Sequence, residues 1–309
     1  MTLDSIGIDI SKDRLDVFRL SDGVQERFDN SRAGFRKLRR WLGKTPPARV
    51  VYEATGAFHS AFERACADHL PLCKVNPLQA RRFAQARGTR AKNDAVDARM
   101  LALMGAAFAL EPDLPVPEEQ RELKELQVQH TALVKDRTRL LNRLKIQTLA
   151  LTRRQTRARL AQVERQLETI RTEIAARLSQ TRPRALDILH SIPGIGQVAA
   201  AAILIECPEI GTLGNKQIAS LAGLAPMTRQ SGRWKGKAFI QGGRKFLRDA
   251  LYMPALVAIR FNPDMKARYD RLRNAGKPAK VAITAVMRKL LELANALIRD
   301  GRKWAAKTT

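Results

Sequence analysis

Four carboxylates near the start of the sequence have the types and the spacing of a metal site for phosphodiester chemistry. Asp9 ends the apolar run 5–10, Glu53 ends the run 49–53, and Asp94 and Asp97 lie three residues apart. Residues three apart share one face of a helix, so both aspartates can bind the same cation. Carboxylate oxygens suit Mg²⁺ or Mn²⁺, and two such cations can activate an attacking oxygen and stabilise a leaving oxygen.

A hydroxyl far along the chain has the surroundings of a nucleophile. Ser231 precedes Gly232 in a loop with many cationic side chains. Four of them could stabilise an alkoxide and a pentacovalent phosphorus: Arg229, Arg233, Lys235 and Arg244. Taken alone, a Ser-Gly pair in a basic loop is more typical of a turn, and no general base is evident nearby.

The whole chain is strongly basic. Its 56 Lys and Arg outnumber 30 Asp and Glu, which gives a net charge of +26, and residues 228–309 alone carry 20 cations against 5 anions. Such a balance predicts a polyanionic partner, DNA or RNA, because neutralising phosphates releases counterions. Five cations before the aspartate pair would hold phosphates against the metals: Arg81, Arg82, Arg87, Arg90 and Lys92.

A glycine-rich turn offers a second place for a phosphate. The segment 191–196 contains Gly194 and Gly196 and precedes a run of small residues typical of a helix. In a helix, turn, helix arrangement the backbone N–H groups at the second helix start can receive a phosphate without reading base sequence. The alternative is a plain connection in which Pro and Gly end one helix and start the next.

Several classes of protein do not fit this sequence. No apolar run approaches the roughly 18 residues that a membrane span needs, and the N-terminus lacks the pattern of a secretory signal, so we expect a cytoplasmic protein with no membrane partner. Three cysteines without paired spacing and scattered histidines indicate neither disulfides nor zinc: Cys66, Cys73 and Cys207. No nucleotide-binding P-loop motif is present.

The hydrophobic pattern predicts an α/β domain followed by helices. Short β runs alternate with amphipathic stretches over 1–110, with strands expected at 6–10, 15–20, 49–52 and 72–75. A proline-rich segment then opens a spacer, 111–182, whose apolar residues recur at helical spacing and predict a coiled-coil hairpin turning near 152–156. This apolar stripe suits an intramolecular core or an oligomer seam. A mainly helical domain, 183–309, ends in a basic helix at 279–299.

Motifs along nearly the whole chain resemble one family. They are Ile6 to Asp13, Tyr52 to Gly56, Val75 to Pro77, Ala91 to Arg99, Ile192 to Gly196, Leu221 to Pro226, Gln230 to Gly232 and Gly242 to Arg244. In this order they are similar to the DEDD-plus-serine transposases of insertion-sequence family one-ten.

The resemblance implies a fold and a site. The expected fold is an N-terminal RuvC-like, ribonuclease H-like domain, a coiled-coil spacer and a C-terminal transposase domain. The DEDD set would be Asp9, Glu53, Asp94 and Asp97, and the nucleophile Ser231. The resemblance also implies a recombinase that joins donor and target DNA through a covalent phosphoserine link, is guided by a structured bridge RNA and forms homodimers and homotetramers with shared sites.

Two rival interpretations use fewer of these features. A RuvC-like junction nuclease would need only the four carboxylates and would hydrolyse DNA with water, leaving Ser231 in an ordinary turn. A protein that only binds nucleic acid would need neither the carboxylates nor the serine. The carboxylate set disfavours the pure binder, and the large basic C-terminal domain disfavours the compact nuclease.

Overall fold

The computed structural model describes residues 4–43, 45, 47–54, 56, 58–88, 94–232 and 234–306. The chain divides into two compact units, Met1–Val116 and Pro117–Thr309. Each unit has its own hydrophobic core. The segment between the last helix of the first unit and the first helix of the second contains neither helix nor strand, as its three prolines predict.

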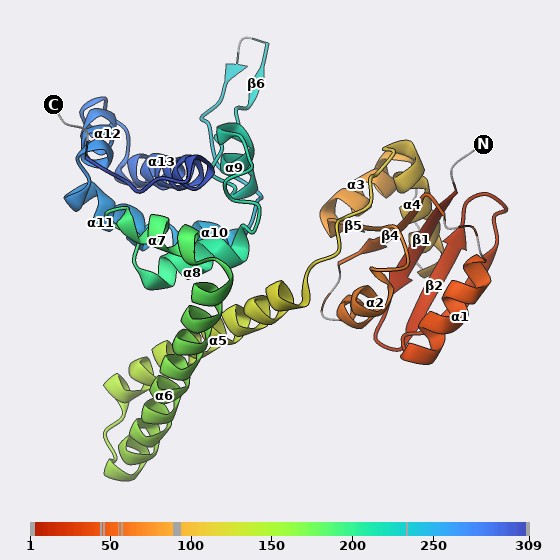
Figure 1. The fold of residues 1–309 in the computed structure, drawn as a ribbon, viewed down its shortest axis with the longest axis horizontal. Coiled ribbons are helices and arrows are strands. Elements are labelled where there is room, and N and C mark those ends of the chain that lie inside the picture. Colours follow the sequence, from red (N-terminus) through yellow and green to blue (C-terminus); the bar gives the residue numbers. More distant parts are fainter. Residues whose placement is uncertain are drawn as a thin grey trace. The chain divides into compact units, whose positions relative to one another are not determined.

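The first unit is built on a five-stranded mixed sheet (Figure 1). Its strands are β1 (Ser5–Ile10), β2 (Arg14–Arg19), β3 (Gln25–Asp29), β4 (Arg49–Glu53) and β5 (Leu72–Val75), in the order β3-β2-β1-β4-β5. The first three strands pair antiparallel, and β4 and β5 pair parallel to β1. Parallel pairing brings the carboxyl ends of β1, β4 and β5 to one edge.

Helices cover both faces of this sheet. On one face, α1 (Arg32–Leu42) and α2 (His59–Cys66) pack on the isoleucines of β1 around Phe35 and Phe62. On the other, α3 (Pro77–Ala86) and α4 (Asp94–Ala107) cover Val51 and Cys73. This ribonuclease H-like arrangement confirms the α/β domain that the sequence predicts.

The sequence pattern missed strand β3. Its residues Gln25–Asp29 are mostly polar and exposed, and β3 pairs only with β2 at the sheet edge. Its one apolar residue, Phe28, packs on the core, so the strand shows no alternation of apolar and polar residues, and its pairing comes from β2 and not from its own sequence.

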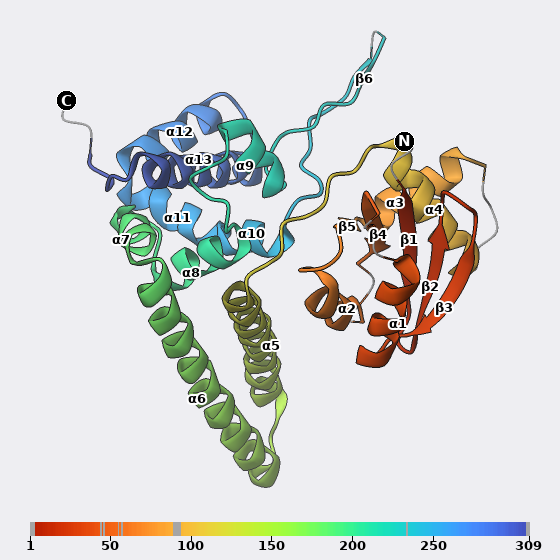
Figure 2. The ribbon, with the colours of Figure 1, turned by 45° about the vertical axis from the view of Figure 1, so that its right-hand side comes forward.

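Two long helices begin the second unit. They are α5 (Glu118–Ile146) and α6 (Ala150–Thr181), and they pack on one another as an intramolecular hairpin (Figure 2). The predicted turn near 152–156 is wrong, because these residues lie inside α6 and the chain turns at 147–149. Residues 152–156 are polar and form no apolar stripe, a pattern typical of a loop. Thr156 is nevertheless buried.

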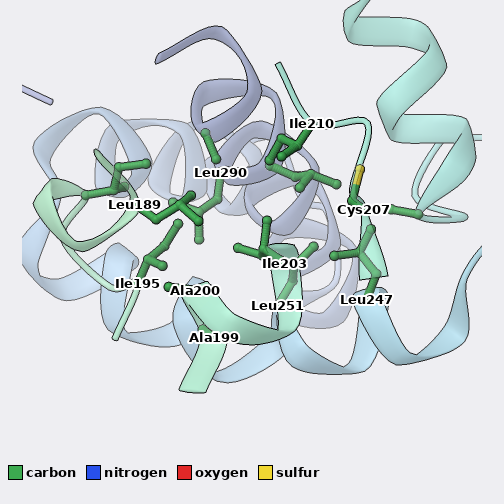
Figure 3. Packing of buried hydrophobic residues seen from close by; sticks show 14 of the residues in the cluster. Leu189, Ile195, Ala199, Ala200, Ile203, Cys207, Ile210, Leu247, Leu251 and Leu290 are labelled. Carbon is green, nitrogen blue, oxygen red and sulfur yellow. The ribbon is translucent and has the colours of Figure 1, made fainter. Parts of the chain in front are cut away.

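Within the described residues, seven further helices form the body of the second unit. They are α7 (Pro183–Ser191), α8 (Gln197–Glu206), α9 (Asn215–Leu221), α10 (Lys245–Ala250), α11 (Tyr252–Phe261), α12 (Pro263–Asn274) and α13 (Ala279–Asp300). Helix α8 lies at the centre of their core, where Ile203 packs among Leu251 and Leu290 (Figure 3). Residues at the base of the α5–α6 hairpin join this core, among them Leu123 and Leu178. None of the described helices is both long and apolar enough to cross a membrane.

Candidate active site

Asp9 lies on the face of the sheet that α4 covers. Side chains alternate along a strand, so Ser5, Gly7 and Asp9 point to one face and the three isoleucines of β1 to the other. The Ser5 hydroxyl donates to the carbonyl of Ala102 in α4 at 2.8 Å, which identifies that face. Asp9 is the penultimate residue of β1 and is partly exposed.

Glu53 ends the neighbouring strand on the same face. In the parallel register Ile8 pairs with Tyr52, so Glu53 comes level with Asp9 at the carboxyl edge. Two positions before it, Val51 contacts α4, and Arg49 donates to the carbonyl of Gly105 in α4 at 2.6 Å. Glu53 therefore shares both the edge and the face of Asp9, and it too is partly exposed.

Helix α4 brings the aspartate pair to this edge. Gly105 near its end lies beside Ser5 at the strand start, whereas Ala98 near its beginning lies beside Gly7, so α4 runs opposite to β1. The approach is very close, because a Cβ on Gly7 would lie 1.9 Å from the Ala98 carbonyl oxygen. Asp97 precedes Ala98 and is partly exposed, so it stands at the edge that carries Asp9 and Glu53.

The donor set suits a hard divalent cation. Three part-exposed carboxylates share one edge and one face of the sheet, and oxygen ligands of this kind bind Mg²⁺ or Mn²⁺. Within the described residues, no three Asp, Glu, His or Cys side chains already converge closely enough to hold an ion. Asp94 begins α4, three residues before Asp97, but its side chain lies outside the described part of the structure.

Of the cations that precede the aspartates, Arg81 and Arg82 lie on α3 and Arg87 directly follows its end. Arg81, Arg82 and Arg87 are exposed, and the Arg87 guanidinium lies 5.9 Å from the ring centre of Phe83. Helix α3 packs against α4 on the face of the carboxylates. Arg90 and Lys92 lie outside the described residues.

Ser231 lies at the tip of a short β-hairpin that extends away from the helices of the second unit (Figure 1). Strand β6 (Gln230–Ser231) pairs antiparallel with β7 (Trp234–Lys235), and Ser231 faces Trp234 across the ladder. Gly232 supplies the positive φ of +54° that the tight turn requires. The serine is exposed, so its hydroxyl is open to a large substrate. Arg233 and the Lys235 side chain lie outside the described residues.

Backbone and cation contacts fix the two legs of this hairpin. Met227 and Phe239 exchange backbone hydrogen bonds of 2.8 and 3.1 Å. The Arg229 guanidinium stacks 4.6 Å from the ring centre of Phe239, which joins the legs a second time. These contacts outside the two-residue strands therefore also hold the hairpin together.

A clamp at the hairpin base was not anticipated from the sequence. Gly223 and Gly243 lie so close that a Cβ on Gly243 would lie 2.1 Å from the Gly223 nitrogen, and both have positive φ. The Arg248 guanidinium donates to the Gly242 carbonyl at 2.7 Å and to the Ala222 carbonyl at 3.3 Å. The sequence signal for this clamp was the presence of glycines on both flanks of the basic loop, because paired glycines permit two backbone segments to approach closely.

Arg244 anchors the same base to the core. Its guanidinium binds both carboxylate oxygens of Glu209, at 2.7 and 2.9 Å, and the Glu206 carbonyl at 2.6 Å. Burial raises the pKa of Glu209, but the hydrogen bond and charge of Arg244 outweigh it and hold the pKa below its ordinary value. The structure gives Arg244 a positioning role beneath the hairpin.

The glycine turn between α7 and α8 has two dissimilar glycines. Gly194 has a φ of +103° and packs on α11, where an added Cβ would lie 2.7 Å from the Pro254 carbonyl. Gly196 has open space around it and caps α8 without a side-chain hydrogen bond. The first glycine serves packing, and the second leaves the first turn of α8 accessible to an anion.

A ribonuclease H-like sheet with carboxylates at one edge is typical of metal-dependent enzymes that process nucleic acids. Comparison with known proteins adds two matches to protein families. A DEDD transposase model named for IS110 matches residues 6–153, which include all four carboxylates. A model of the transposase IS116/IS110/IS902 family matches residues 186–270, which include Ser231.

Known relatives match the chain over different lengths. A pilin gene-inverting protein of Moraxella lacunata is 32% identical over 314 residues, and that of Moraxella bovis 31%, with 96% of each chain covered. An uncharacterized 42 kDa protein of insertion element IS900 from Mycobacterium paratuberculosis is 36% identical over 132 residues, 41% of this chain and 33% of that protein. The chain belongs to the IS110 family of transposases, which makes it a DNA transposase or recombinase whose DEDD domain implies a divalent metal site.

Proposed function

We propose that this recombinase cleaves and rejoins DNA strands through a covalent link to Ser231, supported by a Mg²⁺-dependent DEDD site. The observation that carries the proposal is the exposed Ser231 hydroxyl at the tip of a projecting hairpin whose base is clamped by Arg248 and Arg244. A hydroxyl in a turn of no function does not need an anchored support. A nucleophile does, because small displacements of a reacting atom cost large factors in rate.

The proposed reaction exchanges one phosphodiester for another. The Oγ of Ser231 forms a bond to phosphorus while the bond to the leaving sugar oxygen breaks, and the proton lost by the serine balances the proton gained by the released sugar hydroxyl. A sugar hydroxyl of the partner strand then attacks the phosphoserine and frees the serine again. Because the number of phosphoester bonds stays constant, the exchange needs no ATP.

The carboxylates and basic residues would complete the site. Mg²⁺, or Mn²⁺ in its place, would be held by Asp9, Glu53, Asp94 and Asp97 and would supply Lewis-acid stabilisation of charged phosphoryl oxygens. Arg229, Arg233 and Lys235 would hold the phosphate near the serine, and Arg81, Arg82, Arg87, Arg90 and Lys92 would hold it near the carboxylates. Backbone amides at Gly194 and Gly196 would add a phosphate contact that does not depend on the base sequence.

Assembly and guidance are further parts of the proposal. We propose that residues 1–110, 111–182 and 183–309 act as catalytic, spacer and transposase segments of a homodimer or homotetramer that completes its sites between copies. A structured guide RNA would bind the basic surface together with the donor and target DNA. If an RNA encoded beside the gene binds no tighter than an unrelated RNA of equal length, that result counts against the guide RNA.

The names of the relatives suggest two outcomes for the DNA. Two relatives that match over 96% of their length are named for gene inversion, and the IS900 protein belongs to an insertion element. Strand cleavage and rejoining is the chemistry common to both outcomes. We propose that this chemistry is the activity of this chain, whichever segment of DNA it moves.

A covalent-trapping assay with matched variants tests the proposal. Wild type, Ser231→Ala and Asp9→Ala are incubated with supercoiled donor DNA and Mg²⁺, and Ser220→Ala, an exposed serine on α9, serves as the control. The proposal predicts an adduct with wild type and Ser220→Ala and none with the other two. Nicking that persists in Ser231→Ala but not in Asp9→Ala would instead establish a nuclease that uses water.

A further inference from the structure

Arg268 on α12 has no partner within the described part of the protein. Its guanidinium makes no hydrogen bond or ion pair there, and its Nε is buried without an acceptor. Two other cations of α12 are satisfied: Lys266 pairs with Asp270 at 2.6 Å, and Arg273 donates to the Lys277 carbonyl at 2.7 Å. A part-buried guanidinium with unused donors is costly, since its lost hydration is not replaced.

Arg288 on the adjoining helix α13 is in a similar state. Its Nε is also buried without a hydrogen bond, and its one ion pair, with Glu292, is long at 3.6 Å. Glu292 lies at the same time 3.4 Å from the Lys289 ammonium, so a single carboxylate is shared between two cations. The Arg288 side chain remains 27% exposed, which leaves it within reach of a ligand.

The two arginines act on one another electrostatically. Burial lowers the pKa of Arg268, and the positive charges of Arg288 and Arg271 lower it further, against a smaller opposing effect of Glu292. Helices α12 and α13 pack together, so the repulsion is built into the fold. An anion between the two guanidinium groups would relieve the repulsion and satisfy the unused donors together.

We propose that Arg268 and Arg288 form a phosphate-binding site between α12 and α13 that holds the backbone of a nucleic acid. Guanidinium groups are suited to this ligand because their planar donors match two phosphate oxygens, and a cation pair of this kind recognises a phosphodiester whatever the base. The site requires only that the protein binds nucleic acid, which its family implies. It is independent of the role proposed for Ser231.

Salt-dependent binding of the full-length protein tests the site. The variant Arg268→Gln/Arg288→Gln is compared with Lys266→Gln/Arg273→Gln, which removes the same charge from cations already satisfied within α12 and its cap. Affinity for duplex DNA and for single-stranded RNA of equal length is measured in chelator, so that cleavage does not contribute. Loss of one phosphate contact should reduce the slope of log affinity against log salt by about 0.9 on duplex DNA or about 0.7 on a single strand.

Thermal stability supplies the second readout. Because the two guanidinium groups repel each other, the Arg268→Gln/Arg288→Gln protein should melt at the wild-type temperature or above it. A reduced slope on either polymer, with stability kept, supports the site and identifies the polymer that it holds. An unchanged slope on both polymers, or a slope change no larger than that of the control variant, overturns the proposal. A melting temperature below that of the control also overturns it, since it would show a structural role.

Discussion

Replacing Gly7 with alanine should disable the carboxylate site without touching a carboxylate. The added Cβ would lie 1.9 Å from the Ala98 carbonyl oxygen and 2.5 Å from the Ala102 nitrogen. Ordinary contact distances are about 3.5 Å, so α4 has to retreat from β1 by roughly 1.5 Å. Overpacking costs about 1–3 kcal/mol, and a clash with helix backbone belongs at the upper end. We therefore expect a loss of about 3 kcal/mol.

Two measurements separate this effect from general damage. Calorimetry of the full chain should show a melting transition lowered by about 12 °C, the shift that 3 kcal/mol produces in a domain near this size. Strand cleavage should fall by about 100-fold, because Asp97 moves relative to Asp9, while DNA binding is retained. The control is Gly214→Ala, whose Cβ would meet only the flexible side chain of Gln217, at 3.3 Å. If Gly7→Ala melts and cleaves like wild type, the close approach of α4 to β1 is wrong.

Three further predictions follow from the two units. Asp9→Ala or Asp97→Ala should abolish Mg²⁺-dependent nicking and leave DNA affinity unchanged in a gel-shift assay; cleavage that continues in chelator contradicts the metal site. Gly223→Ala, whose Cβ would lie 2.1 Å from the Gly242 carbonyl oxygen, should slow adduct formation at least tenfold with binding intact. Burial and the charge of Arg171 lower the pKa of His130, so this histidine binds a proton more readily in the unfolded chain than in the folded one. The free energy of unfolding should therefore be highest above about pH 6.5 and decline below it. In urea titrations, His130→Gln should weaken this decline.

The sequence predicts most of the first unit because its signals are local. The strands predicted at 6–10 and 49–52 follow from apolar runs with a carboxylate at or beside their ends, and Asp97 is indicated by its helical spacing from Asp94. What the pattern does not contain is the direction of α4 or its register on β1. These depend on Gly7 and Ala98 meeting across 91 residues of sequence, a contact that no local periodicity records.

The contacts that anchor the Ser231 hairpin could not be predicted from the sequence for a similar reason. Arg244 belongs by composition to the basic loop, and its sequence neighbours suggest a phosphate contact. Only the fold brings Glu209 against it from the turn after α8, and only the fold brings Gly223 beside Gly243. Sequence shows which side chains are charged, whereas packing between distant segments decides which charges are already satisfied.

The most direct test of the covalent link to Ser231 is to locate it by mass spectrometry. Wild-type protein trapped on donor DNA is treated with nuclease and trypsin, and the peptide that keeps a nucleotide is sequenced. Trypsin cuts after Arg229 and Arg233, and Ser231 is the only hydroxyl-bearing residue between these cuts. We expect the nucleotide on the peptide 230–233. A nucleotide on any other peptide, or DNA nicked by wild type with no protein attached, would contradict it.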